Sequence, residues 1–490
     1  MMRAYDVAAI RLAEDTARAA LPEGALMQRA AAGLASSVLS LLADADRPAY
    51  GTRVVLLVGP GDNGGDALLA GARLARRGVR VDALLVTEHA HAAGLAALRG
   101  AGGGVHAAAD PASALTSAAS DLLARADLVV DGILGIGGRP GLSGAAELLV
   151  GAVPTSALVV AVDLPSGIDP ETGDLSGTYV RADVTVTFGV AKPALLLPPA
   201  SAVVGRLEVV DIGVPLPGRP AVERLDAADL AERWPVAGAS DDKYRRGVLG
   251  VVAGGPTYTG AAVLCTGGAV RAGAGMVRYV GPSAPSDLVR ARWPEVVPGN
   301  GQVQAWLIGP GLDPEADADQ REAAETALAS DLPCVVDAGA LGLVPDHRAA
   351  PTLLTPHAGE LARLLQAHGD DVSRADVEAA PLRHSRRAAE LTGATVLLKG
   401  AVTLVVPPRG PARSQADGPH WLATAGSGDV LAGIAGALLA AGLSPLDAGT
   451  LAVGAHGAAG HLASSGGPVS ASSVLDAVPA AIRQLLAARH

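Results

Sequence analysis

A glycine-rich run near the end of the chain carries residues whose types and spacing could do chemistry. Residues 424–433 read TAGSGDVLAG and lead into a long apolar stretch. Glycines before a helix start let backbone N–H groups converge on an anion, which the helix dipole also favours. Asp429 falls in the first helical turn, where it can take a proton from a hydroxyl that attacks a phosphoryl group. Alone, the same aspartate would be a helix-capping acid, so its assignment depends on its partners.

Two further loops in this half of the chain follow predicted strands. Lys399 lies in LLKGAVT, where its ammonium group could neutralise phosphates, and His357 lies in LTPHAGE. Each could instead be an ordinary loop residue exposed to solvent. His456 and His461 are interpreted as helix-surface or core histidines.

A second glycine-rich loop, 59–66, reads GPGDNGGD and lies between a predicted strand and a predicted helix. Gly59, Gly61 and Gly64 match the GxGxxG fingerprint of dinucleotide-binding loops. The acid expected about 20 residues later would be Asp82, but it falls inside the next strand rather than at its end. The pattern therefore departs from a standard Rossmann cofactor site, and a tight strand-to-helix turn is the alternative.

Polar side chains end three predicted strands in this half: Asn63 with Asp66, then Asp131, then Asp163 with Ser166. Ligands of open α/β sheets bind at the carboxyl ends of the strands. Amide, carboxylate and hydroxyl oxygens together suit a hard cation. Each residue alone could form an Asx-turn or a cap, but three such loops favour a shared site.

Alternating strand and helix signals must position these loops. The opening segment 4–42 is predicted to be helical, and helices are also expected at 68–77, 429–441 and 448–464. Near-continuous apolar runs predict N-terminal strands at 53–58, 79–86, 127–131, 157–163, 182–188 and 207–211. They predict C-terminal strands at 247–253, 276–280, 305–308, 334–337, 352–354, 395–398 and 403–406. This alternation predicts parallel, doubly wound sheets.

A proline-rich and then charged segment separates the two halves. We predict one domain over 1–215, a linker over 216–242 and a second domain over 243–490. A chain of 490 residues is long enough for two or three domains. Its apolar residues are mostly Ala, Val and Leu, since aromatic residues make up only 2% of the chain.

Charge and cysteine content exclude several classes of protein. The net charge of −11 argues against a nucleic-acid or anionic-membrane partner held by bulk charge. Cys265 and Cys334 give neither a disulfide framework nor zinc spacing. Early acidic residues and the lack of an apolar h-region predict no signal peptide, and a cytoplasmic protein is expected.

Taken together, these motifs resemble the bifunctional NAD(P)H-hydrate repair enzymes, in which an epimerase domain is fused to an ADP-dependent (S)-NAD(P)H-hydrate dehydratase domain. The resemblance spans nearly the whole chain. GPGDNGGD, DGILGIG and DLPSGID are similar to the epimerase, and LTPHAGE, LLKGAVT and ATAGSGDVLAG to the dehydratase. It implies an α/β fold class, with an N-terminal Rossmann-like three-layer sandwich and a C-terminal ribokinase-like three-layer domain.

The resemblance also implies the chemistry. Reduced nicotinamide cofactors take up water at C6 of the ring and form two epimeric hydrates, NAD(P)HX. The N-terminal domain would interconvert (R)- and (S)-NAD(P)HX. The C-terminal domain would dehydrate the (S) epimer to NAD(P)H while ADP, carried with Mg2+, gives AMP and phosphate. K+ would serve the epimerase half, and family members are commonly homo-oligomers.

Site residues follow from the matching motif positions. Asp429 and Asp163 are the expected catalytic residues. In the epimerase half the hydrate would contact Asp62, Asn63, Gly64, Gly65, Asp66, Gly135, Ile136, Gly137, Gly138, Arg139, Pro140, Gly141 and Asp163. In the dehydratase half it would contact Ala261, Gly311, His357 and Asp429. The nucleotide would contact Lys399, Gly400, Ala401, Val402, Thr403, Gly426, Ser427 and Gly428, and K+ would be held by Asn63, Asp131 and Ser166.

The sequence departs from the family pattern at three positions. The family loop GPGNNGGDG has Asp62 and Ala67 here, and the family's DADxL has Gly339 in place of its second aspartate. An added negative charge at Asp62 is expected to weaken binding of a phosphate-bearing substrate. A ribokinase-like small-molecule kinase with a fused ligand-sensing domain is the alternative function. Resemblance alone favours ADP over ATP, and the choice between NADHX and NADPHX stays open.

Overall fold

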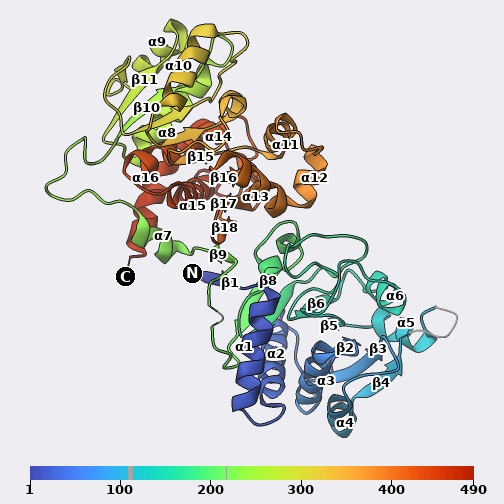
Figure 1. The fold of residues 1–490 in the computed structure, drawn as a ribbon. Helices are drawn as coiled ribbons and strands as arrows, with labels where there is room; N and C mark the ends of the chain where they lie inside the picture. Colours follow the sequence, from blue (N-terminus) through green and yellow to red (C-terminus); the bar gives the residue numbers. More distant parts are fainter. Residues whose placement is uncertain (109–113, 217, 490) are drawn as a thin grey trace. The chain divides into compact units, whose positions relative to one another are not determined.

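The computed structural model describes residues 1–108, 114–216 and 218–489. The chain divides into two compact units (Figure 1). The N-terminal unit comprises Arg3–Val222, and the C-terminal unit comprises Glu223–His490 with Met1–Met2. The division falls inside the segment 216–242, in which the structure has β9 (Val222–Arg224) and α7 (Ala227–Arg233). The domain boundaries at 215 and 243 stay a prediction.

A seven-stranded parallel sheet forms the centre of the N-terminal unit. Its strands lie in the order β4-β3-β2-β5-β6-β7-β8. They are β2 (Arg53–Val58), β3 (Arg80–Leu85), β4 (Gly104–Ala107), β5 (Leu128–Gly132), β6 (Leu158–Val162), β7 (Val184–Phe188) and β8 (Arg206–Val210). The predicted parallel sheet is confirmed, and β4 is the strand that the apolar pattern missed.

Alternating side chains of this sheet pack into two layers of helices. Val54 and Leu56 of β2 share one buried cluster with α2 and α3, whereas Val55 and Leu57 share another with α5 and α6. This alternation is the two-residue period of a strand that is buried on both faces. The helices are α1 (Val7–Ala20), α2 (Ala25–Asp44), α3 (Asp62–Ala75), α4 (Ala92–Gly100), α5 (Ser117–Ala124) and α6 (Ala145–Gly151). Two short 3-10 helices follow, η1 (Pro193–Leu195) and η2 (Ala200–Ala202).

Helix α2 is long and apolar enough by composition to cross a membrane. In the structure it belongs to the core of the N-terminal unit, where Leu34 and Val38 are fully buried against the sheet and α3. Core helices commonly pass the same length and hydropathy test.

An eleven-stranded sheet contains β9 to β18 together with β1, in the order β1-β9-β18-β17-β16-β15-β14-β13-β10-β11-β12. The strands from β12 to β16 in this order are parallel, and β16-β17-β18 are antiparallel. The bounds are β1 (Met2–Ala4), β10 (Val248–Val252), β11 (Met276–Val280), β12 (Val297–Pro298), β13 (Ala305–Ile308), β14 (Cys334–Val336), β15 (Thr352–Leu354), β16 (Thr395–Leu398), β17 (Thr403–Val406) and β18 (Ala412–Gln415).

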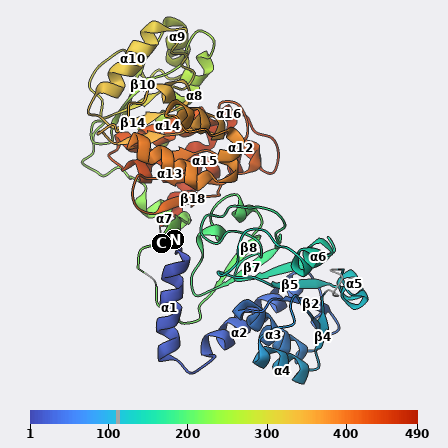
Figure 2. The same ribbon diagram turned by 45° about the vertical axis from the view of Figure 1, so that its right-hand side comes forward.

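Helices lie on both faces of this sheet (Figure 2). One layer contains α8 (Thr259–Ala272), α14 (Ser427–Ala440), α15 (Pro445–Ser464) and α16 (Ala471–Ala487), whose buried side chains share a cluster with β10 and β13. The remaining helices are α9 (Ser283–Arg292), α10 (Ala318–Ala329), α11 (Ala358–Ala367), α12 (Arg374–Ala379) and α13 (Pro381–Thr392), with η3 (Ala338–Leu343) and η4 (His420–Leu422). Of these, α10 packs on β10 and β13, and α13 packs on β16 and β17.

Helices α8 and α14 cross closely because glycines lie at their contact. A Cβ atom on Gly433 would lie 2.1 Å from the backbone oxygen of Cys265, and one on Gly268 would lie 2.5 Å from that of Val430. Neither backbone can move aside without shifting its helix. This contact fixes α14, whose first turn carries Asp429.

We expect Gly433→Ala to lower the free energy of unfolding of the C-terminal unit by about 2 kcal/mol, because overpacking typically costs 1–3 kcal/mol. Gly260→Ala on α8 is the matched control, since a Cβ there meets nothing within 4 Å. It should be neutral or stabilising by up to about 1 kcal/mol. All four tryptophans lie after residue 222, so tryptophan fluorescence during denaturant unfolding reports on this unit. Equal stability of the two variants would contradict the tight contact.

Candidate active sites

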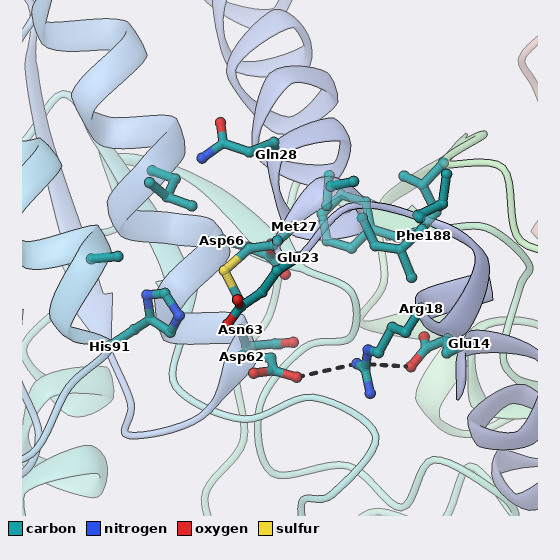
Figure 3. A pocket seen from close by; sticks show the side chains of 18 of the residues that line it. Glu14, Arg18, Glu23, Met27, Gln28, Asp62, Asn63, Asp66, His91 and Phe188 are labelled. Carbon is teal, nitrogen blue, oxygen red and sulfur yellow. Dashed lines mark hydrogen bonds and ion pairs between the residues drawn. The ribbon is translucent and has the colours of Figure 1, made fainter. Parts of the chain in front are cut away.

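The first candidate site lies where the order of strands in the N-terminal sheet reverses, between β2 and β5. The chain leaves both strands at the same edge, and ligands of open α/β sheets bind at such a switch point. A pocket of about 910 Å3 lies there, lined by α1, α2, the start of α3 and the ends of β6 and β7. Figure 3 shows Asp62, Asn63 and Asp66 around the same space as Glu14 and Arg18.

The predicted loop 59–66 is in the structure a short turn, 59–61, followed by the first turn of α3, and its glycines hold it against the loop that follows β5. A Cβ on Gly59 would lie 1.9 Å from the backbone oxygen of Ile133, and one on Gly64 would lie 2.1 Å from that of Gly59. Only glycine fits such close backbone approaches. Asp82 lies inside β3, and its carboxylate binds His106 at 2.9 Å. The departure from a standard Rossmann site is therefore real: no acid ends β3 at the expected place.

Asn63, Asp131 and Ser166 converge on the segment after β5. Ser166 donates its hydroxyl to Asp131 Oδ1 at 2.6 Å and its backbone N–H to Oδ2 at 2.7 Å. The amide of Asn63 donates to the backbone oxygen of Val162 at 2.7 Å, and its Oδ1 would lie 2.4 Å from a Cβ on Gly135. Three residues predicted from separate loops are thus brought together.

Asp131 has the environment of a carboxylate that lacks a counter-ion. It is fully buried, and among the described residues it has hydrogen-bond donors but no cationic partner. Burial raises its pKa to about 6 despite the bonds from Ser166 and Ile133. A buried charge without a partner is costly, so this oxygen-rich donor set fits a monovalent cation.

Asp163 follows β6 in a left-handed backbone conformation, with φ of 66°. Such a conformation is uncommon for residues other than glycine and is concentrated at functional sites. Its Oδ1 accepts bonds from the ammonium group of Lys192 and, at 3.0 Å, from the hydroxyl of Thr187. Sequence reasoning missed Lys192, which is 1% exposed. The signal was available: Lys192 interrupts an apolar run and is one of only three lysines in the chain.

Asp66 points from α3 into the same pocket and is 7% exposed. Its Oδ1 has no hydrogen-bond partner among the described residues. Burial holds the pKa of Asp66 well above its usual range, and the negative charges of Asp163, Asp62 and Glu14 add to this effect. Asp66 is therefore a buried carboxyl that favours its protonated form.

The departure at Asp62 places an exposed carboxylate near Arg18 of α1. Arg18 of α1 forms ion pairs with Asp62 at 3.4 Å and with Glu14 at 3.5 Å (Figure 3). Arg18 also pairs with Asp15, so one guanidinium group is shared by three acids and the added negative charge is only partly offset. Gly135, Ile136, Gly137 and Gly138 line a neighbouring pocket of about 430 Å3. Arg139 and Pro140 are exposed beyond it, next to Gly141.

The second candidate site lies at the start of α14 in the C-terminal unit. Gly426 has φ of 83° and precedes the helix, Ser427 and Gly428 form its first positions, and Asp429 is the third helical residue. The predicted place of Asp429 in the first turn is confirmed. Burial raises its pKa to about 7, Asp337 and Glu360 push in the same direction, and Lys399 opposes them.

His456 contacts the start of α14 through Ser427. It is buried on α15, and its Nε2 lies 3.1 Å from the hydroxyl of Ser427. Burial lowers the pKa of His456 to about 4, so the ring is neutral at physiological pH. The interpretation of His456 as a core histidine is confirmed, but its contact with Ser427 also gives it a structural role in the loop.

Lys399 links the strand-end loops of this unit. Its ammonium group binds Asp337 Oδ1 at 2.8 Å and lies 3.8 Å from Glu360. A Cβ on Gly428 would lie 3.4 Å from that ammonium group, so the lysine borders the glycine loop. Asp337 and Glu360 are charged residues of the site that sequence reasoning left without a role. Asp337 is 2% exposed and also accepts the hydroxyl of Thr355 at 2.8 Å.

The other predicted positions lie on neighbouring loops. His357 is exposed at the start of α11, where its Nδ1 accepts N–H groups of Gly359 and Glu360. Ala261 and Gly311 are adjacent, since a Cβ on Gly311 would lie 2.7 Å from that of Ala261. Gly400, Ala401 and Val402 form the turn between β16 and Thr403 at the start of β17.

Comparison with known families matches both units. A family model described as YjeF-related protein N-terminus matches residues 23–194, and one described as NAD(P)H-hydrate dehydratase matches residues 249–479. The bifunctional NAD(P)H-hydrate repair enzyme of Mycobacterium leprae is 45% identical over 503 residues, covering 100% of each chain. The enzyme of the same description from Mycobacterium tuberculosis is 47% identical over 457 residues, covering 90% of each chain.

Among solved structures, the C-terminal half is similar to the ADP/ATP-dependent NAD(P)H-hydrate dehydratase from Bacillus subtilis, co-crystallized with ATP and Mg2+. The sequence identity is 25% and the TM-score is 0.49, and the match covers 53% of this chain and 97% of that chain.

Asp66 generates a prediction about stability and pH. Because its pKa is raised in the folded protein, the fold binds this proton at pH values where the unfolded chain has released it. Its contribution to stability is full below the usual aspartate pKa of about 4 and is lost as pH rises toward the folded value. Asp66→Asn should remove this loss and stabilise the protein at pH 8 by about 1–3 kcal/mol.

Thermal unfolding of the N-terminal unit at pH 5 and pH 8, followed by calorimetry, measures this effect. Asp121→Asn, which changes an exposed carboxyl on α5 whose described ion-pair partner is an arginine, is the matched control. The assignment would be wrong if Asp66→Asn and the wild type lost the same stability between the two pH values.

Proposed function

The chain belongs to the family of bifunctional NAD(P)H-hydrate repair enzymes, and from this premise we propose that its two units perform the two repair reactions. The N-terminal unit interconverts the (R) and (S) epimers of NAD(P)HX. The C-terminal unit dehydrates (S)-NAD(P)HX at the expense of ADP. The observation that carries the proposal is Asp429, a carboxyl with a pKa of about 7 between a glycine loop and Lys399.

In the C-terminal unit, Asp429 takes the proton of the C6 hydroxyl group of the substrate. The oxygen of that hydroxyl group attacks the terminal phosphoryl group of ADP. AMP leaves, and the hydroxyl has become a phosphate ester, which is a far better leaving group. Loss of phosphate and of the C5 proton restores the ring double bond. The N–H groups at Gly426–Gly428 stabilise charge on the transferred phosphoryl group, and Lys399 supplies a positive charge beside them.

Mg2+ would be carried by the nucleotide. Within the ranges that the structure describes, no three His, Cys, Asp or Glu side chains are arranged to hold a metal ion. Mg2+ commonly binds through substrate phosphates with one or two carboxylates, and it would neutralise phosphate charge. Binding of Mg2+ mainly through the nucleotide phosphates is compatible with a site in which Asp337 and Glu360 already pair with Lys399.

In the N-terminal unit the pocket bounded by residues 62–66 and Asp163 would receive the hydrate. Asn63, Asp131 and Ser166 would hold K+. When bound, K+ would supply the positive counter-charge that the buried carboxylate of Asp131 lacks. Through Ser166 and Asn63 these residues would fix the loops after β5 and β6 around the substrate. Whole-length relatives that carry both domains favour repair over the alternative of a kinase with a sensor domain.

Asp429→Asn should lower dehydration of (S)-NADHX by at least about 100-fold, because general-base catalysis contributes 10²–10⁴-fold. Epimerisation by the same protein should be unchanged. In the wild type, kcat/KM for dehydration should rise with pH through about 7 and level off above it, since the base must be deprotonated. Recovery of the reduced-nicotinamide absorbance and release of free phosphate measure the reaction. Normal dehydration by the variant would exclude Asp429 as the base.

Removal of K+ should slow epimerisation by at least about tenfold. Loss of a residue that hydrogen-bonds to a metal ligand typically lowers activity by a similar factor. Dehydration of (S)-NADHX in the same sample serves as the control and should not change. Asp131→Asn should abolish the response to K+, because the amide no longer needs charge compensation. Identical epimerisation rates in K+ and in a bulky organic cation would contradict a K+ site.

A further inference from the structure

The pocket of the N-terminal unit contains two carboxyl groups in opposite environments. Asp66 and Asp163 both line it, and both are more than nine-tenths buried. Asp66 has an oxygen without a partner among the described residues, whereas Asp163 is bound to a buried lysine. One carboxyl without a cationic partner beside another that is paired with an ammonium group is a usual arrangement of an acid and a base.

Lys192 cannot itself reach a substrate. Its ammonium group has three protons, and the structure gives it three acceptors: Asp163 Oδ1, the hydroxyl of Thr187 at 2.9 Å and the backbone oxygen of Phe188 at 3.1 Å. Every described donor to Asp163 reaches Oδ1. The ammonium group is therefore held against Oδ1, and Oδ2 of Asp163 has no described hydrogen-bond donor where the side chain lines the pocket.

Asp66 faces mainly negative groups. Asp163, Asp62 and Glu14 disfavour its charged form, and Lys192 favours it more weakly. Arg18, Glu23 and His91 also line the pocket, but Arg18 is paired with Glu14 and Asp62, and His91 accepts the backbone N–H of Gly94. Asp66 thus lines the pocket with a carboxyl group whose buried Oδ1 has no described hydrogen-bond partner.

We propose that Asp66 and Asp163 are the acid and the base of the epimerisation, and that Lys192 is the residue that positions Asp163. This assignment rests on the proposed function of the N-terminal unit and adds the proton-transfer residues to it.

The step balances without a co-reactant. Carbon C6 of the hydrate carries both a hydroxyl and the ring nitrogen N1, so it is a hemiaminal. Asp163 takes the hydroxyl proton, C6=O forms, the C6–N1 bond breaks, and N1 receives the proton of Asp66. Rotation about C5–C6 presents the other face of the aldehyde. N1 then attacks C6 and returns its proton to Asp66, while the new hydroxyl takes back the proton on Asp163.

The experiment uses the full chain with separated (R)-NADHX and no nucleotide, so that dehydration is silent, and chromatography follows the appearance of the (S) epimer. Asp66→Asn and Asp163→Asn should each lower kcat by at least about 100-fold, with KM changed less than about threefold. The double variant should be no slower than the slower single variant, because residues that act as a unit are not additive. Asn is nearly isosteric with neutral Asp66, so that variant should fold.

Lys192→Met should lower kcat and leave KM nearly unchanged, because the lysine acts through Asp163 rather than on the substrate. Asp82→Asn, a carboxyl of the same unit outside the pocket, should stay within about twofold of the wild type. The proposal is overturned if Asp66→Asn keeps more than half of the wild-type kcat, or if Lys192→Met changes only KM. Absence of epimerisation in the wild type would instead overturn the proposed function.

Discussion

Parallel strands must all end on one edge of their sheet, and both sites depend on this constraint. In the N-terminal unit it brings together the loops after β2, β5 and β6, which lie far apart in the sequence. In the C-terminal unit it does the same for the loops after β14, β15 and β16. Charged side chains that are buried at such an edge interact in a low dielectric, so their protonation is set by their neighbours rather than by solvent.

The pKa of the aspartate at this edge differs between the two units. At Asp66 burial and like charges favour the neutral acid, whereas at Asp429 the opposing charge of Lys399 limits the rise and holds the pKa at about 7. An acid that must donate a proton and a base that must accept one near neutral pH need these different settings. Both aspartates have acidic neighbours that raise the pKa and one lysine that lowers it, so burial and the balance of these charges set the two pKa values.

The sequence predicted most of the strands and the loops of both sites, because near-continuous apolar runs and glycine-rich turns are local signals. The missed strands lack such a signal. β4 is a short edge strand, and β18 reads ARSQ, with Arg413 and Gln415 buried through hydrogen bonds to residues near 223–225 and to Asp447. Pairing over such distances cannot be read from a local pattern. The same holds for Asp337, whose partners Thr355 and Lys399 come from two other strand ends.

Residue usage carries a signal that spacing does not. The chain has 38 lysines and arginines, but only three are lysines: Lys192, Lys243 and Lys399. Two of the three form ion pairs with a buried aspartate at a strand end, Lys192 with Asp163 and Lys399 with Asp337. Lysine is a compact point charge on a flexible stem, whereas arginine presents a broad planar fork. Each site thus contains one of the chain's three lysines, and in each the ammonium group fits as a single compact charge beside a buried carboxylate.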